Sequence, residues 1–135
     1  MIRYDITEQD RELIAAALEV LHHNFDPHNH EVGCAVRTKD GRVYTGINCD
    51  GIHGSCAEFI AVGNAYSDGA RKFETIVATH DKAPNKVYAP CGNCRQMLFD
   101  YAPDIMVILN DENNRLIKVM VKDLLPLAWK PDHGE

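Results

Sequence analysis

The sequence contains no hydrophobic run long enough to cross a membrane. Its longest apolar candidate is the five-residue stretch IMVIL at positions 105–109. It also lacks a positive charge balance, because 20 acidic residues face 14 Lys and Arg and the net charge is −6. Nucleic-acid binders need a basic face, so this balance disfavours a nucleic-acid partner. The first residues, MIRYDITEQDRE, do not have the basic-then-apolar layout of a signal peptide, and we expect a cytoplasmic protein without a membrane partner.

Internal repeats, low-complexity tracts and linkers are also missing from the 135 residues. The length is that of one ordinary domain, and the content of 45% hydrophobic and 25% charged residues is typical of globular proteins. We therefore predict a single domain over residues 1–135. The five cysteines are an odd number in a chain without a secretory signal, which favours metal or catalytic chemistry over disulfides.

The hydrophobic pattern predicts alternating helices and strands. Apolar residues at helical spacing predict a helix over residues 6–25 with Thr7 as its N-cap. The Asp-Gly turn at 40–41 predicts a β-hairpin between strands at 31–38 and 42–48. Further helices are predicted at 56–66 and 92–102, strands at 73–80, 105–109 and 115–121, and a final helical turn at 122–126. This order predicts a three-layer α/β/α domain around a mixed five-stranded sheet. The helix at 56–66 is apolar on nearly every side, which predicts burial between layers.

Three of the cysteines fall at the starts of two predicted helices. Cys56 opens one helix, and Cys91 and Cys94, in the stretch PCGNC, open another. Both helices follow strands, so their N-termini should lie at one edge of the sheet, where the helix partial charge lowers thiol pKa values. No fourth Cys or His occupies a comparable position, since His53 lies on the preceding loop. Three thiolates and one open position predict a catalytic zinc site.

Each part of this pattern also has a simpler interpretation. A Cys-x-x-C pair can be a redox motif, although such motifs normally open a helix after the first strand of their fold and this pair comes late. The stretch SCAE fits a capping box, with Ser55 as the N-cap and Glu58 at the third helical position. We favour a general base at Glu58, because a first-turn side chain leans toward the helix N-terminus, where Cys56 lies. Arg95 is expected either to hydrogen-bond a thiolate or to lie solvated on the surface.

The stretches CAE at 56–58 and PCGNCRQ at 90–96 resemble the zinc-dependent cytidine deaminase family, in which a ligand, a Glu two residues on and P-C-x-x-C occur in this order. VGCAV, DGRVYTGIN and DLLP are similar to further stretches of the family, so the resemblance covers nearly the whole chain. It implies one zinc per chain on Cys56, Cys91 and Cys94, with Glu58 moving protons. The implied reaction is hydrolytic deamination of a free cytosine nucleoside or an analogue such as blasticidin S. Cys as the first ligand resembles the small homotetrameric branch, whose active sites are completed by neighbouring subunits.

The resemblance also implies a set of substrate contacts. The residues concerned are Asn48 and Asp50 at the ribose, with Ala57 and Trp129 also at the substrate. Asp50 stands where the family has Glu, in a shortened loop, and Trp129 either packs over substrate or fills the edge of the core. Blasticidin-S deaminases bind substrate with an arginine before the P-C pair, where this chain has Asn85 and Lys86.

Two alternatives concern function and a second site. The amine removed could belong to another ring, guanine-like or pterin-like, or the protein could be a structural or redox zinc protein in which Glu58 only caps a helix. The stretch HHNFDPHNH at 22–30 has the composition of a second metal site. It lacks a helical i, i+4 ligand pair after Pro27, which favours a loop.

Overall fold

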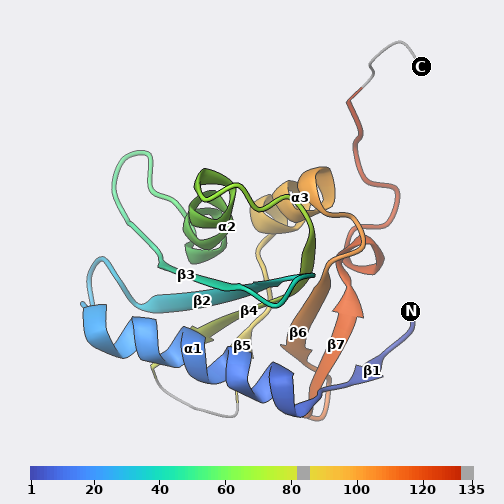
Figure 1. The fold of residues 1–135 in the computed structure, drawn as a ribbon, viewed down its shortest axis with the longest axis horizontal. Helices are drawn as coiled ribbons and strands as arrows, with labels where there is room; N and C mark the ends of the chain where they lie inside the picture. Colours follow the sequence, from blue (N-terminus) through green and yellow to red (C-terminus); the bar gives the residue numbers. More distant parts are fainter. Residues whose placement is uncertain (82–85, 132–135) are drawn as a thin grey trace.

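The computed structural model describes residues 1–81 and 86–131, which form a sheet with helices on both faces (Figure 1). In chain order the elements are β1 (Tyr4–Asp5), α1 (Glu8–Asn24), β2 (Val32–Thr38), β3 (Val43–Ile47), α2 (Ala57–Ser67), β4 (Phe73–His80), β5 (Val87–Tyr88), α3 (Gly92–Tyr101), β6 (Met106–Asn110), β7 (Leu116–Met120) and the 3-10 turn η1 (Val121–Leu124). The predicted α/β/α class is confirmed. The five predicted strands correspond to β2, β3, β4, β6 and β7, and the two-residue strands β1 and β5 add to the sheet.

The sheet topology explains why two helices share one face. The strand order is β1-β7-β6-β4-β2-β3, with β5 paired to β4. β2 is antiparallel to both β3 and β4, so β3 and β4 point the same way, and β4 is parallel to β6. The connections β3–α2–β4 and β4–α3–β6 are therefore parallel crossovers that move in the same direction along the sheet. Because such crossovers are right-handed, α2 and α3 should lie on one face. Figure 1 shows them there, with α1 on the opposite face.

The strand register defines two edges that matter for function. Gly33 at the start of β2 is opposite both Ile47, which ends β3, and Thr79, near the end of β4. We call this the thiol edge, because the chain leads from Ile47 toward Cys56 and from β4 toward Cys91. At the other end of the strands Thr38 pairs with Phe73, and the β2–β3 turn closes what we call the hairpin edge.

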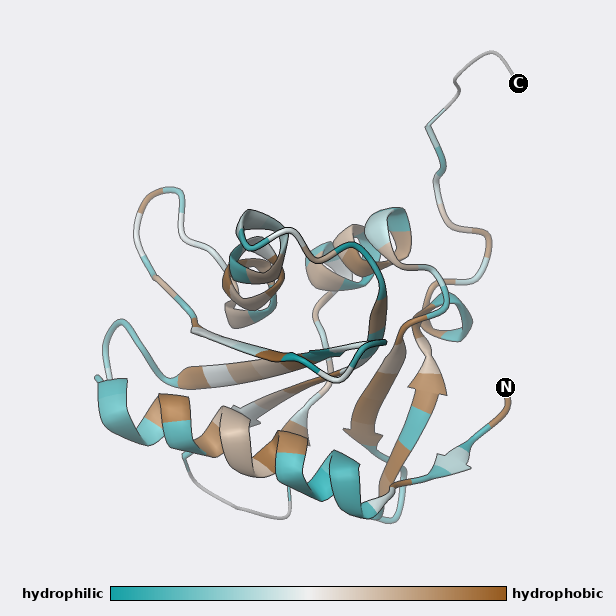
Figure 2. Cartoon of the chain, in the orientation of Figure 1, coloured by the Kyte–Doolittle hydropathy of each residue, from teal (hydrophilic) through white to brown (hydrophobic). Residues whose placement is uncertain are grey.

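Two apolar clusters fill the space on either side of the sheet. Cys34 and Val36 of β2 belong to the cluster beneath α2 and α3, whereas Ala35 between them belongs to the cluster against α1. Figure 2 shows apolar colouring on much of β6 and β7, and polar and apolar bands that alternate along α1. A Cβ at Gly33 would lie 2.3 Å from the Ala17 carbonyl oxygen, so α1 packs directly on the strand backbone there.

Two sequence predictions concern the helices: Thr7 as the N-cap of α1 and the burial of α2. Thr7 is the N-cap of α1, as predicted, and it forms a capping box with Asp10. α2 is buried on one face only, because Phe59 and Ile60 are half-buried and Gly63 is exposed. In the single chain, the predicted burial between layers therefore applies to one face of α2 only. Across residues 1–81 and 86–131, no helix has the length and apolar character that a membrane crossing requires.

A buried ion cluster joins α1 to three strands. The Asp10 carboxylate is fully buried and accepts hydrogen bonds from Arg37 of β2 and Lys118 of β7, each at 2.8 Å. Arg37 also donates its Nε to Glu74 of β4 at 2.8 Å. Burial alone would raise the pKa of Asp10, but the hydrogen bonds from Lys118, Arg37 and Thr7 lower it from 3.8 to about 2.

Candidate metal centre

Three thiols converge at the thiol edge. Cys56 is the N-cap of α2, Cys91 is the N-cap of α3, and Cys94 lies buried in the first turn of α3. Their sulfur atoms all lie within 4.8 Å of one another, and the Cys56 and Cys91 sulfurs are 3.8 Å apart. Two thiolates at about 2.3 Å from a tetrahedral zinc are about 3.8 Å apart, so the three sulfurs fit this metal. Within the described residues they form the one group of His, Cys, Asp and Glu side chains placed to hold a metal ion.

The helix starts place these sulfurs. Both N-cap cysteines have extended backbone, and the Cys91 sulfur lies near the backbone N–H groups of Asn93 and Cys94. The positive ends of the two helices favour anionic thiolates, the form that binds a metal. Because α2 begins at Ala57, Ser55 lies outside the helix and Glu58 is its second residue. The capping-box interpretation of SCAE is wrong.

The thiols differ in acidity when the protein groups are considered alone. Burial raises the pKa of Cys94 strongly and that of Cys56 as well, with the nearby Glu58 carboxylate adding to both. Burial acts against ionisation of Cys91 too, but backbone N–H groups of Cys94 and Asn93 lower its pKa overall. The prediction that the helix N-termini lower all three thiol pKa values therefore holds for Cys91 only.

Glu58 lies among these thiols. The residue is only 6% exposed, and burial raises the pKa of its carboxyl group, although hydrogen bonds from its own N–H and from Cys94 act in the opposite direction. A carboxyl group whose pKa is raised by burial, close to three sulfurs, is a better proton acceptor than an ordinary carboxylate and can return the proton later.

Sequence reasoning missed Cys34, which lies on β2 near this carboxylate. Its thiol is fully buried, and its pKa is raised well above 9.0 by burial and then by the charge of Glu58. The alternation along β2 carries the signal, because Val32, Cys34 and Val36 all face the side of α2.

Asn48 and Asp50 form a network at the same edge. The Asn48 side-chain oxygen accepts the Val32 N–H at 2.9 Å, and its side-chain nitrogen donates to Oδ1 of Asp50 at 3.1 Å. His30 donates from Nδ1 to the Asn48 carbonyl oxygen at 2.8 Å. Asn48 is buried and Asp50 is exposed. The amide therefore holds the carboxylate in place rather than facing solvent itself.

The other predicted site residues have varied surroundings. Ala57 is fully buried in the cluster beneath α2. Trp129 is 67% exposed, so it does not fill the core edge, and its carbonyl oxygen accepts a hydrogen bond from Gln96 of α3 at 3.1 Å. Arg95 donates Nε to the Pro90 carbonyl at 2.8 Å and Nη1 to the Leu124 carbonyl at 3.1 Å. In the described chain these bonds replace the predicted one to a thiolate, and they fix the backbone just before Cys91.

The histidine-rich stretch at 22–30 does not assemble a metal site within residues 1–81 and 86–131. His22 and His23 belong to the last turn of α1, and a short bridge between Asp26 and His30 closes the following turn. Residues 25–30 therefore form a loop, whereas His22 and His23 lie in the helix predicted over residues 6–25.

Comparison with known proteins gives a consistent family assignment. Residues 7–110 match the family model described as the cytidine and deoxycytidylate deaminase zinc-binding region. The chain is 36% identical over 138 residues to the blasticidin-S deaminase of Bacillus cereus, covering 96% of this chain and 98% of that protein. It is 33% identical to a cytidine deaminase of Halalkalibacterium halodurans, covering 89% of this chain and 94% of that protein.

Solved structures agree with this assignment. The cytidine deaminase of Burkholderia pseudomallei superposes with a TM-score of 0.75 at 30% identity, covering 92% of this chain and 100% of that one. The cytidine deaminase of Mycobacterium tuberculosis superposes with a TM-score of 0.74 at 27% identity, covering 93% of this chain and all of that one.

Proposed function

Because the chain belongs to the cytidine and deoxycytidylate deaminase zinc-binding family, we propose that it is a hydrolase that deaminates a free cytosine nucleoside. The substrate is cytidine, deoxycytidine or an analogue such as blasticidin S, and the 4-amino group leaves as ammonia. The observation that carries the proposal is the buried Glu58 carboxyl beside three sulfurs that fit one zinc. A structural zinc site has no use for a buried carboxyl group with a raised pKa beside its thiols.

The mechanism assigns one task to each group. Cys56, Cys91 and Cys94 would hold the metal, and zinc bound there supplies an acidified water as the nucleophile. Glu58 accepts the proton of that water and passes it to ring N3. It then carries the second water proton, from the oxygen now bonded to C4, to the amino group as the bond from C4 to nitrogen breaks. Water and the amine thus become a C4 carbonyl and ammonia, and Glu58 returns to its starting state.

Substrate selection rests on the network at Asn48. Within the described chain the hydrogen bonding of Asp50 engages Oδ1, which leaves Oδ2 to accept a ribose hydroxyl. Ala57 has no exposed side chain, so any contact from this residue comes from its backbone. The exposed Trp129 ring is a candidate to pack over substrate.

A free nucleoside fits this edge better than a nucleotide. A phosphate normally calls for Arg, Lys or a glycine-rich cradle. The guanidinium nearest in sequence to the thiols, that of Arg95, already donates to two carbonyls. Lys86 is exposed at the start of β5, and Asn85 lies outside the described residues.

The outer face of α2 supports an oligomer, and we propose the homotetramer that the resemblance implies. Phe59 and Ile60 are half-buried in the single chain, and the apolar side chains of Ile52, Leu127 and Trp129 are among its most exposed. Apolar side chains left half-buried or exposed in a single chain are commonly covered by a partner. A cytoplasmic location is proposed with it, because the three ligand thiols must stay reduced.

The test is the variant Glu58→Gln. It should keep zinc, fold and oligomeric state, because the amide is nearly isosteric, yet ammonia release should fall by about 100-fold or more because an amide accepts no proton. The matched control is Glu19→Gln, an exposed residue of α1, which should retain activity.

The substrate panel for this test is cytidine, deoxycytidine, blasticidin S, CMP, cytosine, guanine and a pterin. Activity of Glu58→Gln within a few-fold of the native enzyme would remove the proton-transfer role. Faster turnover of CMP, guanine or the pterin than of every cytosine nucleoside would overturn the substrate class.

A further inference from the structure

A groove crosses the hairpin edge, at the end of the sheet opposite the thiols. Its two lobes have volumes of about 460 Å³ and about 300 Å³. The β2–β3 turn forms one wall, the loop after α3 forms the other, and Lys39, Arg71 and Lys72 line both lobes. Each lobe is within the size range of small-molecule sites. We call this the hairpin-edge groove.

The groove is positively charged although the protein is acidic. Its two rim carboxylates are already paired: Asp40 with Arg42 at 3.1 Å, and Asp104 with Lys122 at 3.5 Å. Within residues 1–81 and 86–131, no carboxylate forms an ion pair with any of the three cations shared by both lobes. Three cations without an ion pair in the described chain therefore lie together in one concave place of an acidic protein.

The two lysines are held side by side by the sheet. The Lys39 N–H donates to the Lys72 carbonyl at 3.0 Å, which continues the β2–β4 pairing beyond Thr38. Like charges directly opposite on neighbouring strands destabilise a sheet. An anion between the two ammonium groups would remove that repulsion.

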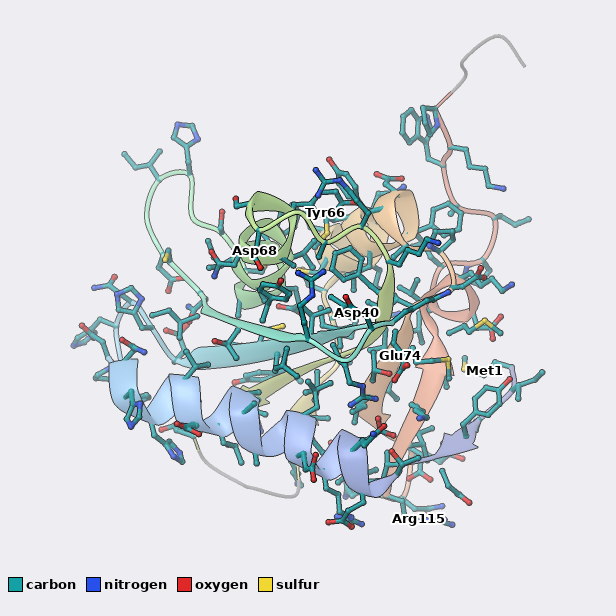
Figure 3. All side chains as sticks on the ribbon, in the orientation of Figure 1. Met1, Asp40, Tyr66, Asp68, Glu74 and Arg115 are labelled. Atoms are coloured by element: carbon teal, nitrogen blue, oxygen red, sulfur yellow. The ribbon has the colours of Figure 1, made fainter. Side chains whose placement is uncertain are left out.

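Arg71 is positioned by α2. Its Nη1 donates to the carbonyls of Tyr66 at 3.1 Å and Ala70 at 2.7 Å, and the guanidinium lies 4.5 Å from the centre of the Tyr66 ring. Tyr66, whose ring the guanidinium contacts, is labelled in Figure 3. The guanidinium is therefore fixed at the groove, with its charge not neutralised by a carboxylate of the described chain.

An aromatic surface adjoins these cations. Tyr101, the last residue of α3, lines the smaller lobe and is 59% exposed. Its ring meets Tyr66 edge-on at 5.2 Å, which holds the ring in place while one side stays open. A fixed and exposed aromatic ring next to cations suits a ligand that has both a planar ring and negative charge.

We propose that the hairpin-edge groove binds a small molecule carrying a di- or triphosphate next to an aromatic ring. The phosphates lie between Lys39, Lys72 and Arg71, and the ring lies against Tyr101. This site is separate from the zinc centre, because the thiols lie at the N-termini of α2 and α3 and the groove lies at their C-termini. It does not depend on the reaction assigned to Glu58.

The experiment measures binding by calorimetry with ATP, inorganic triphosphate and adenosine as probes, at about 50 mM salt so that charge attraction is not screened away. The native protein should bind ATP and triphosphate. Lys39→Glu with Lys72→Glu should weaken both by about tenfold or more, because two attractive charges become repulsive. Tyr101→Ala should weaken ATP binding and leave triphosphate unchanged, which separates the two halves of the ligand.

The matched control is Arg11→Glu with Arg115→Glu, which makes the same charge change in another cleft, of about 490 Å³, that also contains Asp5. It should change ATP affinity by less than about twofold at this salt concentration. Zinc content and melting temperature of each variant establish that it is folded. The proposal is overturned if the native protein binds neither anion, or if the control variant loses as much affinity as the lysine variant. Unchanged ATP affinity in Tyr101→Ala would overturn the aromatic half of the ligand.

Discussion

At Asp50, one carboxylate oxygen accepts a hydrogen bond from Asn48, although the residue itself is exposed. Asn48 positions this carboxylate. Its side-chain oxygen accepts the Val32 N–H, and its side-chain nitrogen donates to Oδ1 of Asp50. A side chain that is both exposed and held in place by a buried neighbour has little conformational entropy to lose on binding. This is the property that a hydroxyl-recognition site requires.

The corresponding prediction concerns Asp50→Ala. Removing a contact to a ribose hydroxyl should lower kcat/KM for cytidine by about 10- to 100-fold, because the hydroxyl would be left unpaired. Turnover of free cytosine has no such contact to lose. The measurement is the ratio of kcat/KM for nucleoside over base in both enzymes, and an unchanged ratio would exclude Asp50 from the ribose site.

Sequence patterns predicted the positions of the three converging cysteines better than those of the residues around them. The positions of Cys56, Cys91 and Cys94 at helix starts were enough to predict that they meet, because helix N-termini after strands share an edge. The partners of Arg95 depend on where the distant η1 turn docks, and no local pattern carries that information. Cys34 was likewise missed, because it lies on β2 beneath the thiols and belongs to no cysteine motif.

At the scale of elements, two close contacts set the distance between helices and sheet. Gly33 lets α1 approach β2, and Gly46 of β3 does the same for α2, where a Cβ would lie 2.6 Å from the Ala61 backbone nitrogen. The strand pattern predicted these strands but not the contacts, since both depend on residues far away in sequence. The strands β1 and β5 were missed because two residues are too few to show alternation.

We expect Gly33→Ala to destabilise the protein by about 1–3 kcal/mol, because the added methyl group overlaps backbone that cannot move independently. Gly63→Ala is the opposite case, since nothing lies within 4 Å of a Cβ there and the position is in the exposed part of α2. It should stabilise the folded chain by about 0.5–1 kcal/mol through the higher helix propensity of alanine. Urea unfolding of the three proteins tests both signs, and equal stability of the two variants would contradict the contact at Gly33.

At the scale of the whole molecule, the Asp10 cluster ties α1 to β2, β4 and β7 through one buried carboxylate. The folded-state pKa of Asp10 is depressed from 3.8 to about 2, so the ionised form favours folding. Its contribution is complete above about pH 4 and is lost as the pH falls toward 2, and the shift corresponds to about 2 kcal/mol.

The variant Asp10→Asn should therefore be less stable than the native protein at neutral pH by about 3–5 kcal/mol, because Arg37 and Lys118 then face a neutral amide in a buried place. The difference in free energy of unfolding between the two proteins should shrink between pH 4 and pH 2. The acid sensitivity of the thiol centre is common to both proteins. It therefore cancels in the difference between their free energies of unfolding. Glu112→Gln, which breaks the exposed pair with Arg3, is the control, and a difference independent of pH would contradict the role of Asp10.

The order in which the thiols occur along the chain has a consequence for biosynthesis. Cys56 precedes Cys94 by 38 residues, and β4, which must pair with β2 before α3 can be placed, lies between them. A ribosome adding about 5–20 residues per second needs roughly 2–8 s to make that interval. During this time Cys56 emerges without its partners, as an unligated thiol on an unfinished sheet. The complete set of three thiols is therefore available to a metal only after the segment that contains β4 and the first turn of α3 has been made.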